Sequence, residues 1–375
     1  MKKSQARGYL LEIVLSKLIE INGYEIIKKA DDNEIVSKPN GLNVRGRGGF
    51  HQFDTLGKFK ITPPFIYPLR LFVEAKFYDV QKKVGIDRVR MGVGILEDVN
   101  TNYSTVKTNN EKLSVERYQY HYAIFSTSGF TEDAQRFAIA HKIHLIDLTC
   151  DEYETIIEPI REIVEKIDDI FSQRNDNIPK EKFSLFKEYF FKVINEKIDE
   201  IDESVYIREL INTIPDLNID TVTELVQKII DLKQNIAGQL IYLATGNSPY
   251  IIPLFSNKNV NEILKKNPHQ DVAITWEEGN SNKWTITLNN EQKPIIKFTL
   301  PEILHQYMIS DKNRIGYNAI NIKNNQINRL VFIAYLDDDN PTLCTLKFNG
   351  EFTKQISRRS KSIVRVGRLT TVMAE

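Results

Sequence analysis

Three acid–base side chains, Asp54, Glu74 and Lys76, stand near one another in the N-terminal part of this 375-residue chain. Glu74 and Lys76 end a bulky, mostly apolar run over residues 69–73, which predicts a buried strand. Because alternate residues of a strand point to the same face, we expect these two side chains to lie side by side. Asp54 ends an earlier extended run, 51–54. Two neighbouring strands would therefore bring all three groups together.

Two carboxylates and one ammonium group in this arrangement are typical of a site that hydrolyses phosphodiesters. Asp54 and Glu74 offer the hard oxygen ligands that Mg²⁺ prefers, with Mn²⁺ as a substitute. A bound divalent cation lowers the pKa of a water ligand and polarises a phosphoryl oxygen. Lys76 would position that water and offset the charge that develops on phosphorus. The alternative is a plain Glu–Lys surface pair at the end of a strand.

The pattern Asp54, then Glu74-Ala75-Lys76, resembles the D…(D/E)xK signature of PD-(D/E)xK nucleases, which have the restriction-endonuclease-like fold. The downstream chain adds a strand at 121–127, a glycine turn, a helix over 133–142 and a strand at 143–148, which predict a βαβ unit. The amino-acid sequence of this stretch is similar to the end of Mrr-like restriction endonuclease domains. The resemblance covers roughly residues 5–150.

The resemblance implies a Mg²⁺-dependent endodeoxyribonuclease of type II or type IV restriction character, working in restriction or antiphage defence. It also implies DNA as partner, a homodimer that cuts both strands, and a defence-system partner protein.

The resemblance also implies further site residues. Glu12 would be a fourth site residue, since the helix before the core sheet often carries such a glutamate; a solvated helix glutamate is the alternative. The Thr/Ser at the end of strand 121–127 would lie near the site. Mrr-like domains often have Gln-x-Lys where this chain has Glu74-Ala75-Lys76. The site of this chain therefore carries one more negatively charged side chain.

Two sets of basic residues flank the trio and are candidates for contacts with the DNA backbone. Arg45 and Arg47 stand among glycines just before Asp54, where a bidentate phosphate clamp is one interpretation and a solvated turn is the other. Four more cations follow the catalytic strand, on an expected helix that would either face DNA or simply face solvent: Lys82, Lys83, Arg88 and Arg90. His51 is interpreted either as a neighbour of the metal or as a structural histidine.

Charge is unevenly distributed, although the formal net charge of the chain is zero. Residues 1–150 carry a net +5, residues 151–235 a net −10 and the remainder a net +5. The length also exceeds what one compact core usually holds. We therefore expect an α/β nuclease domain at 1–150, an acidic helical linker or bundle at 151–235, and a mostly β (α+β) domain for recognition or regulation at 236–375.

Local patterns refine this division. An apolar stripe predicts a helix over 4–22, and polar, glycine- or asparagine-rich composition predicts loops at 30–49 and 100–111. In the last third, β-rich runs predict strands at 272–276, 283–288, 295–298, 330–335 and 343–348. The basic tail, with Arg358, Arg359 and Lys361, would either touch phosphates or serve solubility.

Cysteine usage and hydropathy bound the cellular setting. The chain has two cysteines, too few for a disulfide framework and without zinc-site spacing. Neither a signal peptide nor an apolar run long enough for a membrane span is seen, so a cytoplasmic protein without membrane contact is expected. Two rival functions stay open: a nucleic-acid-binding sensor or scaffold whose nuclease domain is inactive or conditionally activated, and a nuclease for RNA or branched DNA.

Overall fold

The computed structural model of the chain separates into two compact units, Met1–Gly238 and Gln239–Glu375. It describes residues 1–30, 34–39, 41–62, 64–79, 81–102, 104–108, 111–115, 118–171, 177–196, 202–214, 217–247, 250–257, 259–276, 282–288, 291, 293–337 and 340–351. The basic tail after residue 351 lies outside these ranges. Within them, no helix has the length and hydropathy needed to cross a membrane.

A five-stranded sheet forms the centre of the first unit, with the strand order β1-β5-β6-β9-β10. Its strands are β1 (Tyr24–Ile26), β5 (Thr55–Phe59), β6 (Leu69–Lys76), β9 (Gln119–Ser126) and β10 (Ile143–Asp147). The strands β5 and β6 pair antiparallel, whereas β6, β9 and β10 run parallel. The strand beside β6 therefore begins just after Asp54, and the expectation that the run 51–54 would be this neighbour is wrong. The βαβ prediction for 121–148 is thus confirmed.

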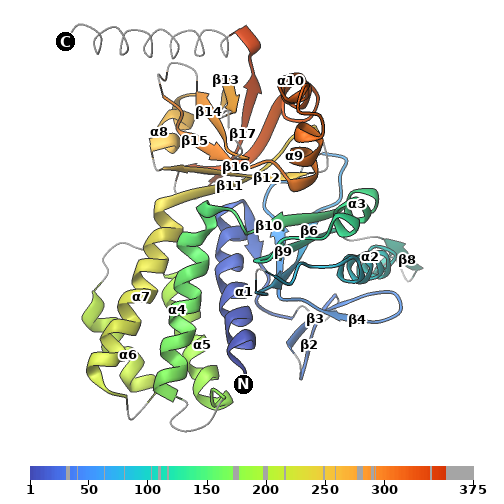
Figure 1. Cartoon of the computed structure of the whole chain (residues 1–375). Helices are drawn as coiled ribbons and strands as arrows, with labels where there is room; N and C mark the ends of the chain where they lie inside the picture. The colour runs from blue at the N-terminus through green and yellow to red at the C-terminus, as the bar shows by residue number, and fades with distance from the viewer. Residues whose placement is uncertain are drawn as a thin grey trace, which may run out of the picture. The chain divides into compact units, whose positions relative to one another are not determined.

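Helices cover both faces of this sheet (Figure 1). The predicted first helix is present as α1 (Lys3–Ile21) and packs on β1, β5 and β6. The crossover helices α2 (Ile86–Asn100) and α3 (Glu132–Ala140) pack on β9 and β10 and on each other. The hydroxyl of Thr131 accepts a hydrogen bond from the Ala134 N–H, so Thr131 caps α3 as its position in the sequence suggests.

The two predicted loops in this region are wrong. Residues 30–49 contain β2 (Ile35–Lys38) and β3 (Gly41–Arg45), which pair with β4 (Phe50–Gln52) in a small antiparallel sheet. Glu34, just before β2, accepts a buried hydrogen bond of 2.9 Å from Arg70 of β6. This anchor is distant in sequence, so local polarity gives no sign of it. The stretch 100–111 likewise enters a hairpin of β7 (Ser104–Thr108) and β8 (Glu111–Val115).

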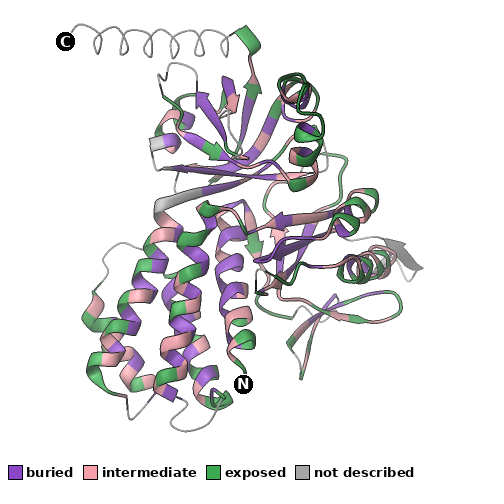
Figure 2. Cartoon of the chain, in the orientation of Figure 1, coloured by how far each residue is buried: buried purple, intermediate pink, exposed green. Residues whose placement is uncertain are grey.

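The acidic segment expected to be helical is helical, and it belongs to the same compact unit as the sheet. A 3₁₀ turn (Asp151–Tyr153) leads into α4 (Glu154–Phe171), followed by α5 (Lys180–Asn195), α6 (Glu203–Thr213) and α7 (Ile219–Gly238). Its apolar stripes are buried between the helices, as Figure 2 shows. Both α4 and α5 pack on α1, so this segment shares the helix that carries Glu12.

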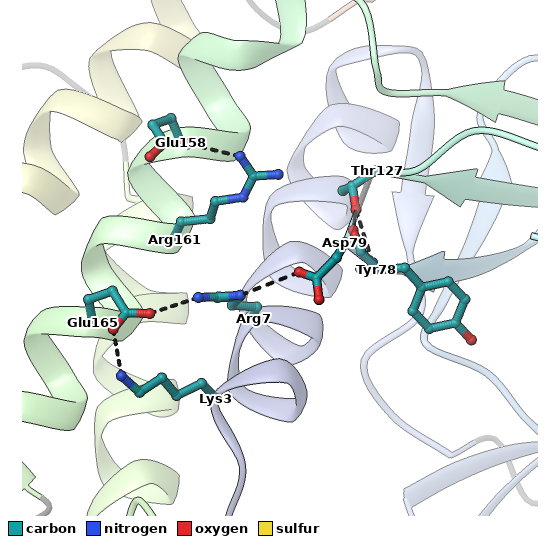
Figure 3. Close-up of polar contacts among 8 residues, drawn as sticks. All are labelled: Lys3, Arg7, Tyr78, Asp79, Thr127, Glu158, Arg161 and Glu165. Atoms are coloured by element: carbon teal, nitrogen blue, oxygen red, sulfur yellow. Dashed lines mark hydrogen bonds and ion pairs between the residues drawn. The ribbon is translucent and has the colours of Figure 1, made fainter. Parts of the chain in front are cut away.

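Ion pairs fasten α1 to α4 beside the sheet (Figure 3). Glu165 of α4 accepts hydrogen bonds from Lys3 at 2.6 Å and from Arg7 at 2.7 Å. Arg7 also reaches Asp79, in the segment that leaves β6, at 4.0 Å. In the same segment Tyr78 exchanges two hydrogen bonds with the Thr127 hydroxyl, which lies just past β9. These contacts hold the exits of two parallel strands in place.

The second unit is a closed seven-stranded barrel with the order β11-β12-β15-β14-β13-β17-β16. Its elements are β11 (Gln239–Thr245), β12 (Ile251–Asn257), α8 (Asn259–Lys266), β13 (His269–Trp276), β14 (Trp284–Leu288), β15 (Ile296–Phe298), α9 (Glu302–Ile309), α10 (Ile315–Asn325), β16 (Arg329–Asp337) and β17 (Asn340–Phe348). The five predicted strands are all present, while β11 and β12 were not anticipated. Trp284 and Phe298 lie at its buried centre.

Candidate active site

The strand β6 carries Glu74 and Lys76 to the edge of the first unit's core. Residues 71–73 in its middle are apolar and buried, whereas Lys76 is partly exposed at the strand's end. The Lys76 ammonium forms an ion pair with Oε1 of Glu74, as expected for alternate residues on one face. Glu74 itself is 93 % buried, and a buried carboxylate needs partners to remain charged.

Asp54 joins this pair from the neighbouring strand. It stands immediately before β5, whose first residue, Thr55, lies opposite Val73 of β6. Oδ2 of Asp54 accepts a hydrogen bond of 2.8 Å from the N–H of Ala75, the residue between Glu74 and Lys76. The backbone of β6 thus positions the Asp54 carboxylate next to the other two side chains.

Tyr122 of β9 completes the surroundings of Glu74. Its hydroxyl donates a hydrogen bond of 2.6 Å to Oε2 of Glu74, while its ring stacks on Phe72 at a centroid separation of 5.2 Å. Burial, followed by the charge of Glu74, raises the pKa of Tyr122, so the phenol stays protonated and acts as a donor. Sequence reasoning missed this residue because its position in the strand 121–127 marked it only as core.

Glu12, on α1, adds a third carboxyl group to Asp54 and Glu74. Burial, followed by the negative charge of Asp54, raises the pKa of Glu12 to about 8. Burial likewise raises the pKa of Asp54, against the opposing effects of the Ala75 N–H and Lys76. The backbone carbonyl of Glu12 also accepts a hydrogen bond of 3.4 Å from Thr55. Glu12 and Asp54 are thus two partly dehydrated acids that interact through their charges.

A second cation, Lys187 of α5, faces these acids and was not anticipated. Its ammonium lies 4.6 Å from the centre of the Tyr9 ring, one helical turn before Glu12 on α1. The positive charge of Lys187 lowers the pKa of both Glu12 and Asp54, although burial outweighs it in each case. Lys187 also lines a cavity of about 320 Å³ on α5. Nothing in its local sequence distinguishes it from the other lysines of an acidic helical segment.

The donor set fits a hard divalent cation. Among the described residues, no group of three or more His, Cys, Asp and Glu side chains is spaced to hold a metal ion. Mg²⁺, however, usually takes only one or two protein carboxylates and keeps several waters. Asp54 and Glu74 supply two such groups, and a cation beside them would favour the ionised forms of Asp54 and Glu12, which burial disfavours.

The arginine–glycine loop is built around Asp98 near the end of α2. Gly48 and Gly49 donate backbone hydrogen bonds to the Asp98 carboxylate at 2.7 and 3.1 Å, and His51 Nε2 lies 2.7 Å from the same group. His51 therefore has a structural partner. Arg45 ends β3 and Arg47 lies in this loop, and both side chains are exposed.

The four cations that follow β6 are exposed, but only Arg88 and Arg90 lie on a helix, since Lys82 and Lys83 precede the start of α2. Lys82 lies 5.2 Å from the centre of the Tyr78 ring, and Arg90 pairs with Asp87 of its own helix at 3.3 Å. The charge of Arg88 acts on Tyr122 and partly offsets the rise of its pKa. Arg88 is thus electrostatically linked to the group that holds Glu74.

The serine and threonine at the end of β9 lie beside the trio's strand. Ser126 is the register partner of Lys76, and the N–H of Thr127 donates to the Lys76 carbonyl at 3.1 Å. The Ser126 hydroxyl donates to the Gly129 carbonyl and so shapes the following turn. Gly129 has a φ of +70°, a left-handed conformation that suits glycine.

Comparisons with known proteins do not identify the chain. No family model matches it, and no curated protein matches it. One similar solved structure is titled "Crystal Structure of Protein of Unknown Function AF1548"; it is 18 % identical, covers 61 % of this chain and 98 % of its own, and has a TM-score of 0.33. Another is the complex of the FERM and C-terminal domains of Drosophila Merlin, at 10 % identity, 67 % and 96 % coverage and a TM-score of 0.12. Neither likeness bears on function.

Proposed function

We propose that the first unit is a metal-dependent endonuclease of the restriction-endonuclease-like fold that hydrolyses phosphodiester bonds of DNA. One observation carries the proposal: the Asp54 carboxylate accepts the Ala75 N–H, so that Asp54, Glu74 and Lys76 gather on two neighbouring strands. Residues far apart in the sequence thereby form the acid, acid and lysine set that the chemistry requires.

Each group has a role that its surroundings support. Asp54 and Glu74 would hold Mg²⁺, and Tyr122 keeps Glu74 oriented through its hydrogen bond. The bound cation would lower the pKa of a water and polarise the phosphoryl oxygen. Lys76, fixed by Glu74, would hold the attacking water and stabilise negative charge on the phosphoryl group.

Glu12 and Lys187 would adjust the charge of the site. Glu12 retains a proton near neutral pH because it is buried beside Asp54, and this limits repulsion among the acids before substrate binds. Lys187 contributes a positive charge from α5, where an anionic DNA backbone would be attracted. Arg45, Arg47, Lys82, Lys83, Arg88 and Arg90 would supply further phosphate contacts. A role in restriction or antiphage defence, with a dimer as the cutting form, follows from the family resemblance.

Cleavage of supercoiled plasmid tests the proposal. Wild-type protein should nick or linearise the plasmid with Mg²⁺ or Mn²⁺ and should be inactive with EDTA. Asp54→Asn keeps an oxygen that accepts the Ala75 N–H but removes the negative charge, so cleavage should fall by at least about a hundredfold. Asp169→Asn, which changes an exposed carboxylate on α4, is the matched control and should cleave normally.

Three outcomes would contradict the proposal. Activity that persists in EDTA would exclude a metal-dependent mechanism, and equal cleavage by Asp54→Asn would exclude this site. Cleavage of structured RNA or branched DNA with no cleavage of plasmid would assign a different substrate to the same residues.

A further inference from the structure

The barrel of the second unit contains a polar cavity of about 800 Å³ that the nuclease proposal does not use. It is lined by residues of three adjacent strands, β13, β17 and β16, together with Asn247, Asn324 and Asn328. Pockets that hold small molecules usually measure about 300–1,000 Å³. The cavity is therefore large enough for an organic ligand and larger than a simple ion needs.

Strand register lines up three charged side chains on these strands. Lys347 of β17 lies opposite Asp271 of β13 on one side and Arg329 of β16 on the other. Neighbouring strands are about 5 Å apart, so the two cations stand next to each other. Like charges that face each other across strands are destabilising. Neither Arg329 nor Lys347 forms an ion pair with any residue that the structure describes.

An unpartnered hydroxyl lies in the next row of the same face. Thr345 of β17 is 93 % buried, and its Oγ1 has no hydrogen-bond partner among the described residues. Thr345 lines the cavity beside His269, its register partner on β13. A buried hydroxyl without a partner costs free energy, which a ligand acceptor would recover.

The part of the lining around Asn247 has a fixed shape. The backbone N–H of Asn247 donates to the Gln326 carbonyl at 2.9 Å, and the Asn247 amide donates to Oδ1 of Asn328 at 2.6 Å. A Cβ on Gly246 would lie 2.3 Å from the Gln326 carbonyl oxygen, so this close approach requires glycine. The amides of Asn247 and Asn328 are thereby held in place before any ligand arrives.

We propose that this cavity binds a nucleotide, with its phosphate between Arg329 and Lys347. A phosphate there would remove the repulsion between the two cations and would accept hydrogen bonds from both. Asp271 would accept a sugar hydroxyl or a base amino group, the lining asparagines would meet the base edge, and the half-buried ring of Phe348 offers a stacking surface. The phosphate has two sources with the same chemistry, a free nucleotide or the 5′ end of a nucleic acid strand.

Fluorescence titration of the full chain with mant-ATP tests the free nucleotide, and anisotropy of a labelled, 5′-phosphorylated 12-mer tests the strand end. At least one probe should bind saturably with a Kd below about 1 mM. Arg329→Thr and Lys347→Thr keep β propensity and should each weaken that binding by about tenfold or more. Thr345→Val should weaken it several-fold. Lys297→Thr, at an exposed position on β15 away from the cavity, should leave it unchanged.

The outcomes distinguish a free nucleotide from a strand end, and they show whether the cavity proposal fails. Loss of mant-ATP binding in the two cation variants identifies a free nucleotide, and loss of 12-mer binding alone identifies a strand end. If neither probe binds the wild type, or if binding survives both substitutions in chains with unchanged near-UV circular dichroism, the proposal is overturned. Because the first unit is itself proposed to bind DNA, the 12-mer is compared with the same strand lacking the 5′ phosphate, and only the difference in binding between the two strands is assigned to the cavity.

Discussion

Burial is the dominant influence on the acids of the candidate active site. Glu12 and Asp54 both bind protons more tightly than exposed carboxylates do, and the first cause in each case is loss of hydration. Raised pKa values of this kind cluster at functional sites, because a structural role rarely rewards two dehydrated acids side by side. Glu74 lies deeper in the unit than these two acids and is contacted by Lys76 and by the Tyr122 hydroxyl.

The titration of Glu12 should appear in the stability of the protein. Its pKa is raised on folding, so the folded state binds the extra proton between about pH 4.5 and about pH 8. The contribution of Glu12 to the free energy of unfolding is fully present below pH 4.5 and is lost as pH rises through 8. Glu12→Gln should therefore gain stability relative to wild type as pH rises across this window, as measured by urea unfolding.

A matched exposed position makes this test specific. Glu97→Gln changes an exposed glutamate on α2. The difference between its free energy of unfolding and that of wild type should stay constant across these pH values. If the free energy of unfolding of Glu12→Gln also keeps a constant difference from wild type, Glu12 is ionised like any surface glutamate. Its assignment to the site then loses its physical basis.

The trio could be predicted from the sequence because strand alternation and one hairpin suffice to bring it together. Tyr122 and Lys187 could not, since their roles depend on contacts across β9 and α5 that no local pattern encodes. The same reason explains the missed strands β2 and β3. Their polar composition looks like a loop, and the buried pair of Glu34 and Arg70 that anchors them spans 36 positions.

At the scale of elements, α2 lies unusually close to the sheet at Gly92. A Cβ there would meet the ring of Tyr122 at 3.0 Å, and that ring is stacked on Phe72. Gly94 is on the same helix and has nothing within 4 Å of an added Cβ. The pair separates the effect of packing from the effect of helix propensity.

Alanine at these two positions should have opposite effects on stability. Gly94→Ala should stabilise the protein by about 0.5–1 kcal/mol, because alanine favours the helix. Gly92→Ala should destabilise it by about 1–3 kcal/mol, because the stacked ring has little room to move, and should also lower cleavage by disturbing the partner of Glu74. Urea denaturation measures both; a stabilised Gly92→Ala would show that α2 and β9 are not held this closely.

The contribution of α5 to the site is a second test at this scale. Lys187→Ala removes the cation near Glu12 and Asp54 and should lower the rate of plasmid cleavage by about tenfold. Lys180→Ala, at the exposed first turn of the same helix, should cleave at the wild-type rate. Equal rates of plasmid cleavage by the two variants would mean that the helical segment is only a spacer.

At the scale of the whole molecule, charge is organised although the chain is neutral. The two ends of the sequence carry positive charge and the helical segment negative charge. Arg45 ends β3, and Arg47 lies in the loop whose glycines donate hydrogen bonds to Asp98. The backbone that carries the two arginines is therefore held in place, and their side chains are candidates for phosphate contacts, which position a protein on nucleic acid.

The double variant Arg45→Ala with Arg47→Ala should reduce the salt dependence of DNA binding. Loss of two phosphate contacts should flatten the slope of log K against log salt by about 2. Lys265→Ala with Lys266→Ala, two exposed cations of α8, is the control and should keep the slope. An unchanged slope in the arginine variant would mean that the loop does not touch DNA.

The most direct test of the nuclease site is Lys76→Met, assayed for plasmid cleavage and for DNA binding on the same samples. Methionine keeps most of the length of the side chain but removes the charge that pairs with Glu74. We expect normal circular dichroism and DNA binding close to wild type, with Mg²⁺-dependent cleavage reduced by at least about a hundredfold. Wild-type rates of cleavage by a folded Lys76→Met protein would contradict the assignment of the site.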